Sequence, residues 1–288
     1  MKVEREPGRF GGARRAVAIG TFDGVHLGHR QVLAAAVAAG PTPGAVTFDP
    51  HPRIAFGYAV ELLTTLERRL ELIAELGVEE TLVVSFDQAL ASLTPEEFAE
   101  RVLRAVGTRL VVAGDGFRFG RARSGDLETL RALGFEVRPI VLEPGVSSTK
   151  VRALVREGDL LGAARLLGRP HELDGLVVAG DARGGTLGFP TANLALDPQL
   201  VVPAFGIYAG AARGTRAAVS VGTNPHYGGS EQRVEAFLLD FEGDLYGQRL
   251  VVELWQRLRD ERAFTSEAQL VAQIAADVEA TRAAVRPA

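Results

Sequence analysis

Two segments of the 288-residue sequence carry side chains that could bind phosphates. The first, Gly20-Thr-Phe-Asp-Gly-Val-His-Leu-Gly-His29, follows an apolar run at residues 16–19 and precedes a helical pattern that we expect to cover residues 30–38. His26 and His29 can face the same side near the helix N-terminus and add imidazole donors to its backbone N–H groups. This geometry suits a pyrophosphate. In the alternative interpretation the glycines only make a tight turn and the histidines cap or pack.

The second segment is Gly188-Phe-Pro-Thr-Ala-Asn193. In an extended chain, Thr191 and Asn193 point to the same face and present one hydroxyl and one amide oxygen. Such hard, neutral ligands suit Mg²⁺, with nucleotide phosphates and water completing its shell. A plain turn is the alternative.

A carboxylate at Glu235 could assist the same chemistry. Strict alternation over residues 234–241 places Glu235 on the strand face that carries the bulkier apolar side chains, with Phe237. Desolvation there would suit a general base that acts on a hydroxyl. The alternative is that Glu235, at the start of the strand, reaches solvent or pairs with an arginine, and the pattern alone leaves both interpretations open.

The composition excludes several mechanisms. The absence of cysteine excludes disulfides, thiolate metal sites and a cysteine nucleophile. The only lysines, Lys2 and Lys150, lie outside any P-loop or protein-kinase context. Arginine, histidine, helix N-termini and magnesium must therefore meet phosphate charge. A formal net charge of −4 argues against a broad nucleic-acid-binding surface, so we expect no nucleic-acid partner.

The sequence also predicts a cytoplasmic protein with no membrane partner. Residues 1–15 are polar and contain no apolar signal-peptide core. No run of about 18 apolar residues occurs elsewhere. The oligomeric state is left open, and a homo-oligomer is one of its options.

The first half of the chain alternates strand and helix patterns, which predicts parallel βαβ units in a Rossmann-like α/β domain. Thr94 and Glu97 form the pattern of a capping box, and Gly77, Gly107 and Gly134 are expected to end helices. The expected strands are residues 16–19, 45–48, 81–86, 110–113 and 135–141.

The second half is rich in strand patterns and turn signals, which predicts a small antiparallel β-barrel. We expect a short helix at residues 160–167 before the barrel, and a terminal amphipathic helix at 267–284 that is capped by Ser266 and packs on it. The expected domains are 1–157 and 171–288, joined by a linker at 158–170. The expected barrel strands are residues 176–179, 207–212, 217–221, 234–241 and 249–255.

Together these motifs resemble the bifunctional riboflavin kinase/FMN adenylyltransferases, the bacterial FAD synthetases. The N-terminal motifs include Thr47-Phe-Asp-Pro-His-Pro52, Gly114-Asp-Gly-Phe-Arg-Phe-Gly120 and Ser147-Ser-Thr-Lys-Val-Arg152. The C-terminal motifs include the segment from Gly180 to Asn193, Gly206-Ile-Tyr208 and Val234-Glu-Ala-Phe-Leu-Leu-Asp-Phe241. The resemblance covers nearly the whole chain. His-x-Gly-His alone also marks other nucleotidyltransferases, so its pairing with Pro-Thr-Ala-Asn is the specific feature.

The resemblance implies an N-terminal nucleotidyltransferase domain and a C-terminal riboflavin kinase barrel. ATP would phosphorylate riboflavin to FMN at the barrel, and a second ATP would adenylylate FMN to FAD. It implies Glu235 as the kinase base, His26 and His29 in adenylyl transfer, Thr191 and Asn193 as Mg²⁺ ligands, and Phe189 and Tyr208 as flavin contacts. The implied nucleotide-binding residues are Gly20, Phe22, Asp23, Gly24, Gly28, Asp115, Ser147, Ser148, Thr149, Arg152, Gly180 and Gly188.

Three positions depart from the family pattern. Gly116 stands where Asp or Asn is usual, with Asp115 one residue earlier, and Gly185 and His226 replace a common arginine and threonine. The first departure could impair adenylyl transfer and leave only a riboflavin kinase. A second alternative is a flavin-binding or regulatory protein without turnover, whose flavin binding would be insensitive to Glu235→Gln.

Overall fold

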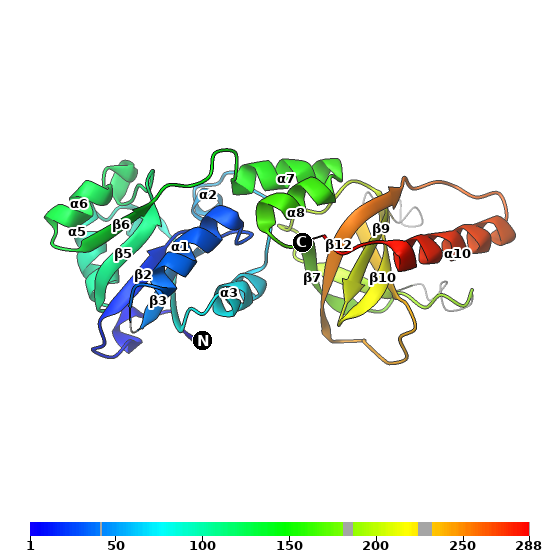
Figure 1. Cartoon of the computed structure of the whole chain (residues 1–288), viewed down its shortest axis with the longest axis horizontal. Helices are drawn as coiled ribbons and strands as arrows, with labels where there is room; N and C mark the ends of the chain where they lie inside the picture. Colours follow the sequence, from blue (N-terminus) through cyan, green and yellow to red (C-terminus); the bar gives the residue numbers. More distant parts are fainter. Residues whose placement is uncertain (41, 181–186, 224–231, 288) are drawn as a thin grey trace. The chain divides into compact units, whose positions relative to one another are not determined.

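The computed structural model describes residues 1–40, 42–180, 187–223 and 232–287 (Figure 1). The chain divides into two compact units. The first unit contains Met1–Val60 and Leu66–Ser147, and the second contains Glu61–Thr65 and Ser148–Ala288.

The second unit begins earlier than the domain boundary expected at residue 157. Helix α7 (Ser148–Glu157) buries Val151 and Val155 in one apolar cluster with residues of α8 (Leu160–Leu167) and with Leu63. Because this shared core holds both helices and a short earlier segment, α7 groups with the second unit. Local sequence patterns do not reveal such a long-range contact.

The first unit is built on a parallel sheet, as the alternating pattern predicted. Within the described residues its strand order is β1-β4-β3-β2-β5-β6, and every pairing is parallel. The N-terminal strand was not predicted, because three residues are too few for a periodic pattern. The strands are β1 (Lys2–Glu4), β2 (Arg15–Ile19), β3 (Pro43–Asp49), β4 (Glu80–Ser85), β5 (Thr108–Gly114) and β6 (Glu136–Ile140).

Helices cover both faces of this sheet. On one face, Val17 and Val111 pack with apolar residues of α5, η2 and α6. On the other, Ala18 and Val112 pack with apolar residues of α1 and α3. Burial on both faces explains the continuous apolar strands. The helices are η1 (Pro7–Arg9), α1 (Leu27–Val37), α2 (Pro52–Ala55), α3 (Leu66–Glu75), α4 (Gln88–Ala91), α5 (Pro95–Phe98), η2 (Ala99–Arg104), η3 (Arg121–Arg123) and α6 (Leu127–Ala132).

The second unit contains the predicted barrel, which is closed in the order β10-β11-β8-β7-β12-β9 with antiparallel pairings. The expected strands are present, but β7 begins earlier than predicted and β8 was read only as an extended segment. The strands are β7 (His171–Val178), β8 (Ala192–Leu196), β9 (Gly206–Ala212), β10 (Thr215–Thr223), β11 (Gln232–Leu238) and β12 (Arg249–Arg259).

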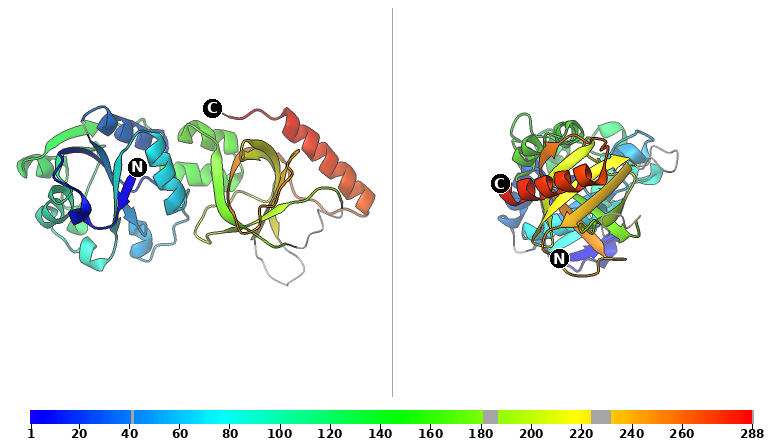
Figure 2. Two further views of the ribbon diagram at one scale, coloured as in Figure 1. Left: turned by 90° about the horizontal axis from the view of Figure 1, so that it is seen from below. Right: turned by 90° about the vertical axis from the view of Figure 1, so that its right-hand side faces the viewer.

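The terminal helix α10 (Glu267–Ala283) runs along the outside of the barrel (Figure 2). Ser266 caps it as predicted, accepting a hydrogen bond from the Gln269 N–H. Its contact with the barrel combines apolar and polar groups: Val278 is buried, and Ala284 at its C-terminal end packs with Ala209 and Trp255. Arg259 pairs with the buried Asp277 at 2.7 Å, and Asp277 is among the few buried residues of the helix.

Candidate active sites

Two segments predicted to bind nucleotide, the histidine motif and the segment at Asp115, lie at one edge of the parallel sheet. Gly20 follows β2 and Asp115 follows β5, and these two strands are neighbours although β3 and β4 lie between them in sequence. The strand order therefore reverses between β2 and β5. In open α/β sheets, ligands bind at the carboxyl ends of the strands at such a switch point. The topology alone thus brings the histidine motif and Asp115 to the same edge of the sheet.

His26 and His29 lie stacked at the start of α1. Their ring centroids are 3.6 Å apart and their planes differ by 15°. Residue 26 is the N-cap of α1, and its Nδ1 accepts a hydrogen bond of 3.3 Å from the His29 N–H. The helix therefore begins at Leu27, not after His29 as expected, because the His26 side chain itself supplies the cap.

The turn that precedes the histidines is buried and backbone-strained. Phe22, Gly24 and Val25 have φ values of 50°, 80° and 40°. Phe22 and Asp23 are almost fully buried, and the Phe22 ring contacts His29 edge-on with centroids 5.4 Å apart. A side chain other than glycine would rarely adopt the conformation of residue 24. In this loop the predicted nucleotide-binding residues Phe22 and Asp23 are therefore buried, and the Phe22 ring packs against His29.

Two further glycines of the motif make room for aromatic rings. A Cβ atom at Gly20 would lie 3.0 Å from the Phe22 ring, and one at Gly28 would lie 3.2 Å from His26 Cε1. At both predicted positions, glycine therefore allows an aromatic ring to lie close to the backbone. The role of the backbone N–H groups there stays a prediction.

Asp115 is exposed after β5, and its Oδ1 accepts a hydrogen bond of 2.9 Å from the Gly116 N–H. A Cβ atom at Gly116 would meet nothing within 4 Å. The substituted position is therefore open, and a larger side chain would fit there. The other two departures, Gly185 and His226, lie outside the described residues.

The Ser147-Ser-Thr segment leads into α7, as expected for a helix start. Ser148 and Thr149 are the first residues of α7, and Arg152 one turn later is buried. Ser148, Thr149 and Arg152 belong to the second unit, whereas Ser147 ends the first. Their contact with nucleotide stays a prediction.

Sequence reasoning missed an aromatic surface in the first unit. Phe56 is 54% exposed and Tyr58 is 60% exposed, just after the carboxyl end of β3. Phe56 packs edge-on against Phe86, with ring centroids 5.6 Å apart. Phe56 and Tyr58 follow the Thr47-Phe-Asp-Pro-His-Pro52 motif at the carboxyl end of β3, and this position in the sequence could have indicated exposed rings at that edge of the sheet.

In the barrel, the structure brings together Thr191, Asn193 and Glu235. The Thr191 hydroxyl donates a hydrogen bond of 3.1 Å to Glu235 Oε2. Asn193 on β8 is directly opposite Glu235 on β11, and residues opposite each other in antiparallel strands share a face. The predicted metal ligands and the predicted base therefore form one cluster.

Asn193 has the features of a ligand-binding amide. Its Oδ1 is buried and has no hydrogen-bond partner in the described part of the chain. A Cβ atom at Gly180 would overlap the amide, lying 2.1 Å from Nδ2 and 2.7 Å from Oδ1. The predicted Gly180 therefore provides the space that the amide occupies. A buried acceptor without a partner normally has a ligand, water or ion to satisfy it.

Glu235 faces the outside of the barrel on the same strand face as the bulkier Phe237, as alternation predicted, but the desolvation expected there is only partial. Val234, Ala236 and Leu238 fill the interior, while the side chain of Glu235 is 28% exposed. The interior of a small barrel has room mainly for small and aliphatic side chains, so the face of β11 that carries the bulkier side chains lies outside. Arg233, from the same strand face, donates to Glu235 Oε1 at 3.2 Å. The alternative of an arginine partner is thus observed.

The two predicted flavin contacts separate. Phe189 lies edge-on to Phe237, 5.5 Å between centroids, and Phe237 shares the outer strand face with Glu235. Tyr208 is fully buried in the barrel core opposite Val219, and its hydroxyl donates to the Ala204 carbonyl. Burial raises the pKa of Tyr208. Tyr208 therefore points into the barrel, whereas Glu235 faces its outside. The predicted nucleotide-binding residue Gly188 lies in an exposed turn, with a φ of 84°.

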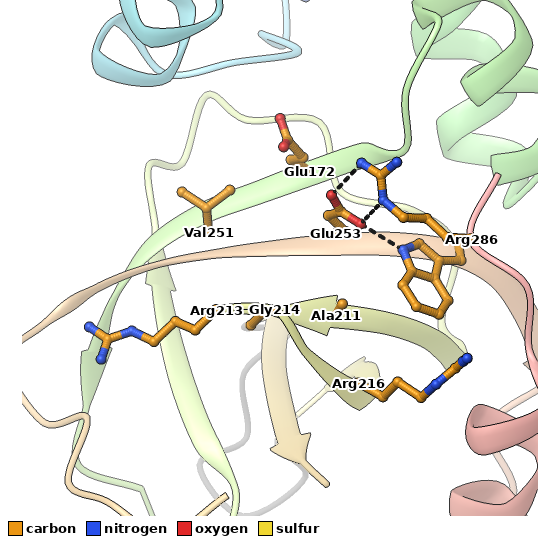
Figure 3. A pocket seen from close by; sticks show the side chains of 10 residues that line it. Glu172, Ala211, Arg213, Gly214, Arg216, Val251, Glu253 and Arg286 are labelled. Atoms are coloured by element: carbon orange, nitrogen blue, oxygen red, sulfur yellow. Dashed lines mark hydrogen bonds and ion pairs between the residues drawn. The ribbon is translucent and has the colours of Figure 1, made fainter. Parts of the chain in front are cut away.

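A pocket of about 440 Å³ lies elsewhere on the outer wall (Figure 3). Arg286 reaches across it to Glu253, with N–O distances of 2.7 and 2.8 Å. Glu253 on β12 lies opposite Ala211 on β9. Glu235 on β11 lies opposite Ser220 on β10, which in turn lies opposite Ile207 on β9. The two carboxylates are therefore aligned with different positions along β9. None of the predicted site residues lines this pocket, so it is not the cluster around Glu235.

Comparisons with known proteins match both units. A family model described as FAD synthetase matches residues 12–148, and one described as riboflavin kinase matches residues 167–285. The bifunctional riboflavin kinase/FMN adenylyltransferase of Escherichia coli K12 is 38% identical, covering 90% of this chain and 89% of its own length. The protein of the same name from Listeria monocytogenes is 34% identical, covering 93% and 92%.

A solved structure from Streptococcus pneumoniae, titled a macrolide-efflux protein, is also similar. It has a TM-score of 0.86 and 32% identity, and covers 98% of this chain and 99% of that chain. Its title names a transport activity. Among the residues described here, no helix combines the length and the apolar character needed to cross a membrane.

Proposed function

This chain belongs to the family of bifunctional riboflavin kinase/FMN adenylyltransferases, and from that premise we propose which residues carry each reaction. The chain phosphorylates riboflavin to FMN and adenylylates FMN to FAD, with ATP as the co-substrate of both steps. We assign the first reaction to the barrel and the second to the parallel sheet. The observation that carries the proposal is the cluster of Thr191, Asn193 and Glu235 on one outer face of the barrel.

Glu235 is the general base of the kinase. Its carboxylate takes the proton of the riboflavin 5′-hydroxyl while that oxygen bonds to the γ-phosphorus of ATP and the bond from this phosphorus to the ADP oxygen breaks. Hydrogen bonds from Thr191 and Arg233 hold the carboxylate in one orientation. Partial exposure leaves it accessible to a substrate hydroxyl.

The residues present fit a magnesium ion. Asn193 Oδ1 has no hydrogen-bond partner among the described residues. The Thr191 hydroxyl donates its hydrogen bond to Glu235, so the lone pairs of its oxygen remain available to a metal ion. Within the described residues no group of three His, Cys, Asp or Glu side chains could hold a metal, so neutral oxygens would supply the protein ligands. When bound there, Mg²⁺ would neutralise charge on the ATP phosphates.

His26 and His29 act in adenylyl transfer. An FMN phosphate oxygen attacks the α-phosphorus of ATP, and the bond from this phosphorus to the β-phosphate oxygen breaks to release pyrophosphate. Because Nδ1 of His26 accepts from a backbone N–H, its neutral ring carries the proton on Nε2, where it can donate to a phosphate oxygen. The N-terminus of α1 adds a favourable dipole for the leaving anion. Asp115, Ser147, Ser148, Thr149 and Arg152 are proposed further nucleotide contacts.

Two pairs of aromatic rings, partly buried in the kinase unit and exposed in the adenylyltransferase unit, are the proposed flavin surfaces. In the kinase unit, Phe189 and Phe237 share the face of Glu235. In the adenylyltransferase unit, Phe56 and Tyr58 offer flat apolar area at the ligand-binding edge of the sheet. An isoalloxazine ring can stack on such surfaces. The buried position of Tyr208 favours a core role over a flavin contact.

The first experiment follows both reactions in the full-length protein. Riboflavin, ATP and Mg²⁺ are incubated with the enzyme, and the flavins are separated chromatographically over time. FMN that appears before FAD supports the proposed order. In a second reaction FMN is supplied directly with ATP. Failure to form FAD there would favour the kinase-only alternative that Gly116 suggested, and unchanged riboflavin would favour a non-catalytic flavin-binding protein.

Cytoplasmic localisation and the absence of nucleic-acid partners stay predictions from the sequence, and the oligomeric state stays open, with a homo-oligomer as one option. The acidic net charge and the proposed small-molecule substrates support the absence of nucleic-acid partners.

A further inference from the structure

Leu142 is an apolar side chain at the edge of the sheet where the histidine motif lies. It follows the end of β6, and β6 pairs with β5 so that Ile140 lies opposite Gly114. Leu142 packs at the border of the apolar cluster between the sheet and α1, but it is only partly buried. Part of this apolar side chain therefore stays accessible at the carboxyl ends of the strands, where open α/β sheets bind their ligands.

Two glycines make room for Leu142. A Cβ atom at Gly114 would lie 3.1 Å from Leu142 Cδ1, which is a tight contact, and one at Gly28 would lie 3.5 Å from Leu142 Cδ2. Gly114 is the last residue of β5, and Gly28 lies in the first turn of α1. The leucine side chain therefore lies against the backbone of both elements.

The same two glycines are next to polar groups that suit a nucleotide. The Cβ position of Gly28 is also 3.2 Å from His26 Cε1, so His26 and Leu142 border the same residue. Asp115 directly follows Gly114, and its carboxylate is exposed and can accept hydrogen bonds from ribose hydroxyls. Imidazole donors for phosphate, an acceptor for ribose and an apolar surface therefore lie along one short stretch of the sheet edge.

We propose that Leu142 is a nucleotide-binding residue of the adenylyltransferase unit, which packs against the purine base of ATP while His26 and His29 bind the phosphates. The proposal rests on the role proposed above for the two histidines. The faces of a purine are largely apolar, and packing one of them on a leucine removes both surfaces from water. The base takes no part in the bonds that form and break. The contact therefore strengthens the ground state and the transition state equally.

The test is Leu142→Ala in the full-length enzyme. The substitution removes the apolar surface beyond Cβ but no charge and no hydrogen bond, so the phosphate contacts should stay intact. We expect the KM for ATP in FMN adenylylation to rise about 4- to 15-fold, the effect of losing about one to two buried methylene groups, with kcat nearly unchanged. The KM for ATP in riboflavin phosphorylation should not change, because we assign that reaction to the other unit.

Inorganic tripolyphosphate separates the base contact from the phosphate contacts, because it has the charged chain of ATP but no base. With Mg²⁺ in excess, it should inhibit adenylylation with the same Ki in Leu142→Ala as in the wild type. In His26→Ala that Ki should rise. A leucine that only filled space would leave the affinities for ATP and tripolyphosphate in their wild-type ratio.

Two variants are matched controls. Leu142→Met keeps an apolar side chain of similar volume, so it should keep a KM for ATP close to the wild-type value. Val141→Ala shortens the adjacent side chain, which is 79% exposed, and should leave the KM and the Ki unchanged. Thermal unfolding measures the stability of each variant, and the kinetics are compared at a temperature at which every variant is folded.

Two results would overturn the proposal. One is a wild-type KM for ATP in folded Leu142→Ala. The other is an equal rise of the KM for ATP and the Ki for tripolyphosphate, because a disturbed histidine turn would weaken both ligands alike. A failure of the histidine assignment is a different result, in which His26→Ala keeps full adenylyl transfer and an unchanged Ki.

Discussion

The hydroxyl of Thr191 lies 3.1 Å from Glu235 Oε2 and donates a hydrogen bond to it. This bond joins a proposed metal ligand to the proposed base, although the two residues belong to segments far apart in sequence. It also orients the hydroxyl, because the donated proton fixes where the remaining lone pairs point. In the proposed kinase mechanism, metal binding and proton abstraction are therefore structurally coupled.

Glu235→Gln should abolish most riboflavin phosphorylation. The amide keeps the shape but cannot take the 5′-hydroxyl proton, so we expect kcat for FMN formation to fall by about 10²- to 10⁴-fold. Riboflavin binding and the adenylylation of supplied FMN should be retained. The measurement is separate initial rates with riboflavin and with FMN. Glu267→Gln, at an exposed position of the same unit, is the control, and a wild-type FMN rate in Glu235→Gln would remove the base from the mechanism.

Gly180→Ala should weaken the response of the kinase to magnesium. The added methyl would overlap the Asn193 amide and displace Oδ1 from its present position. Substitutions that disturb the orientation of a metal ligand commonly cost about 10- to 100-fold in metal affinity. Kinase rates measured against Mg²⁺ concentration should therefore show half-saturation at a higher concentration. Gly12→Ala, where a Cβ atom meets nothing within 4 Å, should leave the curve unchanged; an unchanged curve for Gly180→Ala would argue against Asn193 as a ligand.

Gly116→Asn should improve adenylyl transfer without loss of stability. The position is exposed and open, so the side chain adds no clash, and surface changes of this kind alter stability by about 0.5 kcal/mol or less. One new hydrogen bond to nucleotide contributes about 0.5–1.5 kcal/mol, or roughly a 2- to 12-fold gain in kcat/KM for ATP. Steady-state kinetics with FMN check this. An unchanged value would indicate that Asp115 already fills the role.

The barrel unit should lose stability as the pH falls from about 6.5 toward 3. Burial, together with the nearby charge of Arg169, lowers the pKa of His171 to about 3. The unfolded chain binds this proton near pH 6.5 while the folded chain does not, so acid favours unfolding. From pH 7 to pH 5 the contribution is about 2 kcal/mol.

Trp255, the only tryptophan, reports unfolding of this unit by fluorescence. Urea unfolding of His171→Leu should show a smaller difference between pH 7 and pH 5 than the wild type shows. An equal pH dependence in both proteins would mean that other groups cause the acid sensitivity.

Local chemistry in the sequence predicted many element boundaries correctly. The capping box of Thr94 and Glu97 is present, and Gly77, Gly107 and Gly134 have positive φ where helices or turns end. Helix α8 covers the predicted residues 160–167. These features depend on neighbours within a few residues, which is why spacing alone identifies them.

The faces of some elements could not be predicted in the same way. Alternation separated Glu235 from Val234 correctly, but did not tell which face is the barrel interior, because that depends on how small the closed barrel is. Tyr208 was expected to contact flavin, yet the register with Val219 places it inside. Such choices depend on strand pairing at long range.

By itself the sequence determined the α/β and barrel architecture, the family, and the residue types proposed for each site, because periodicity, caps and short motifs are local properties. Only the tertiary structure decided that α7 joins the second unit, that β2 and β5 are neighbours, and that Thr191 and Asn193 meet Glu235. These relations come from burial and pairing between distant segments, which no local spacing specifies.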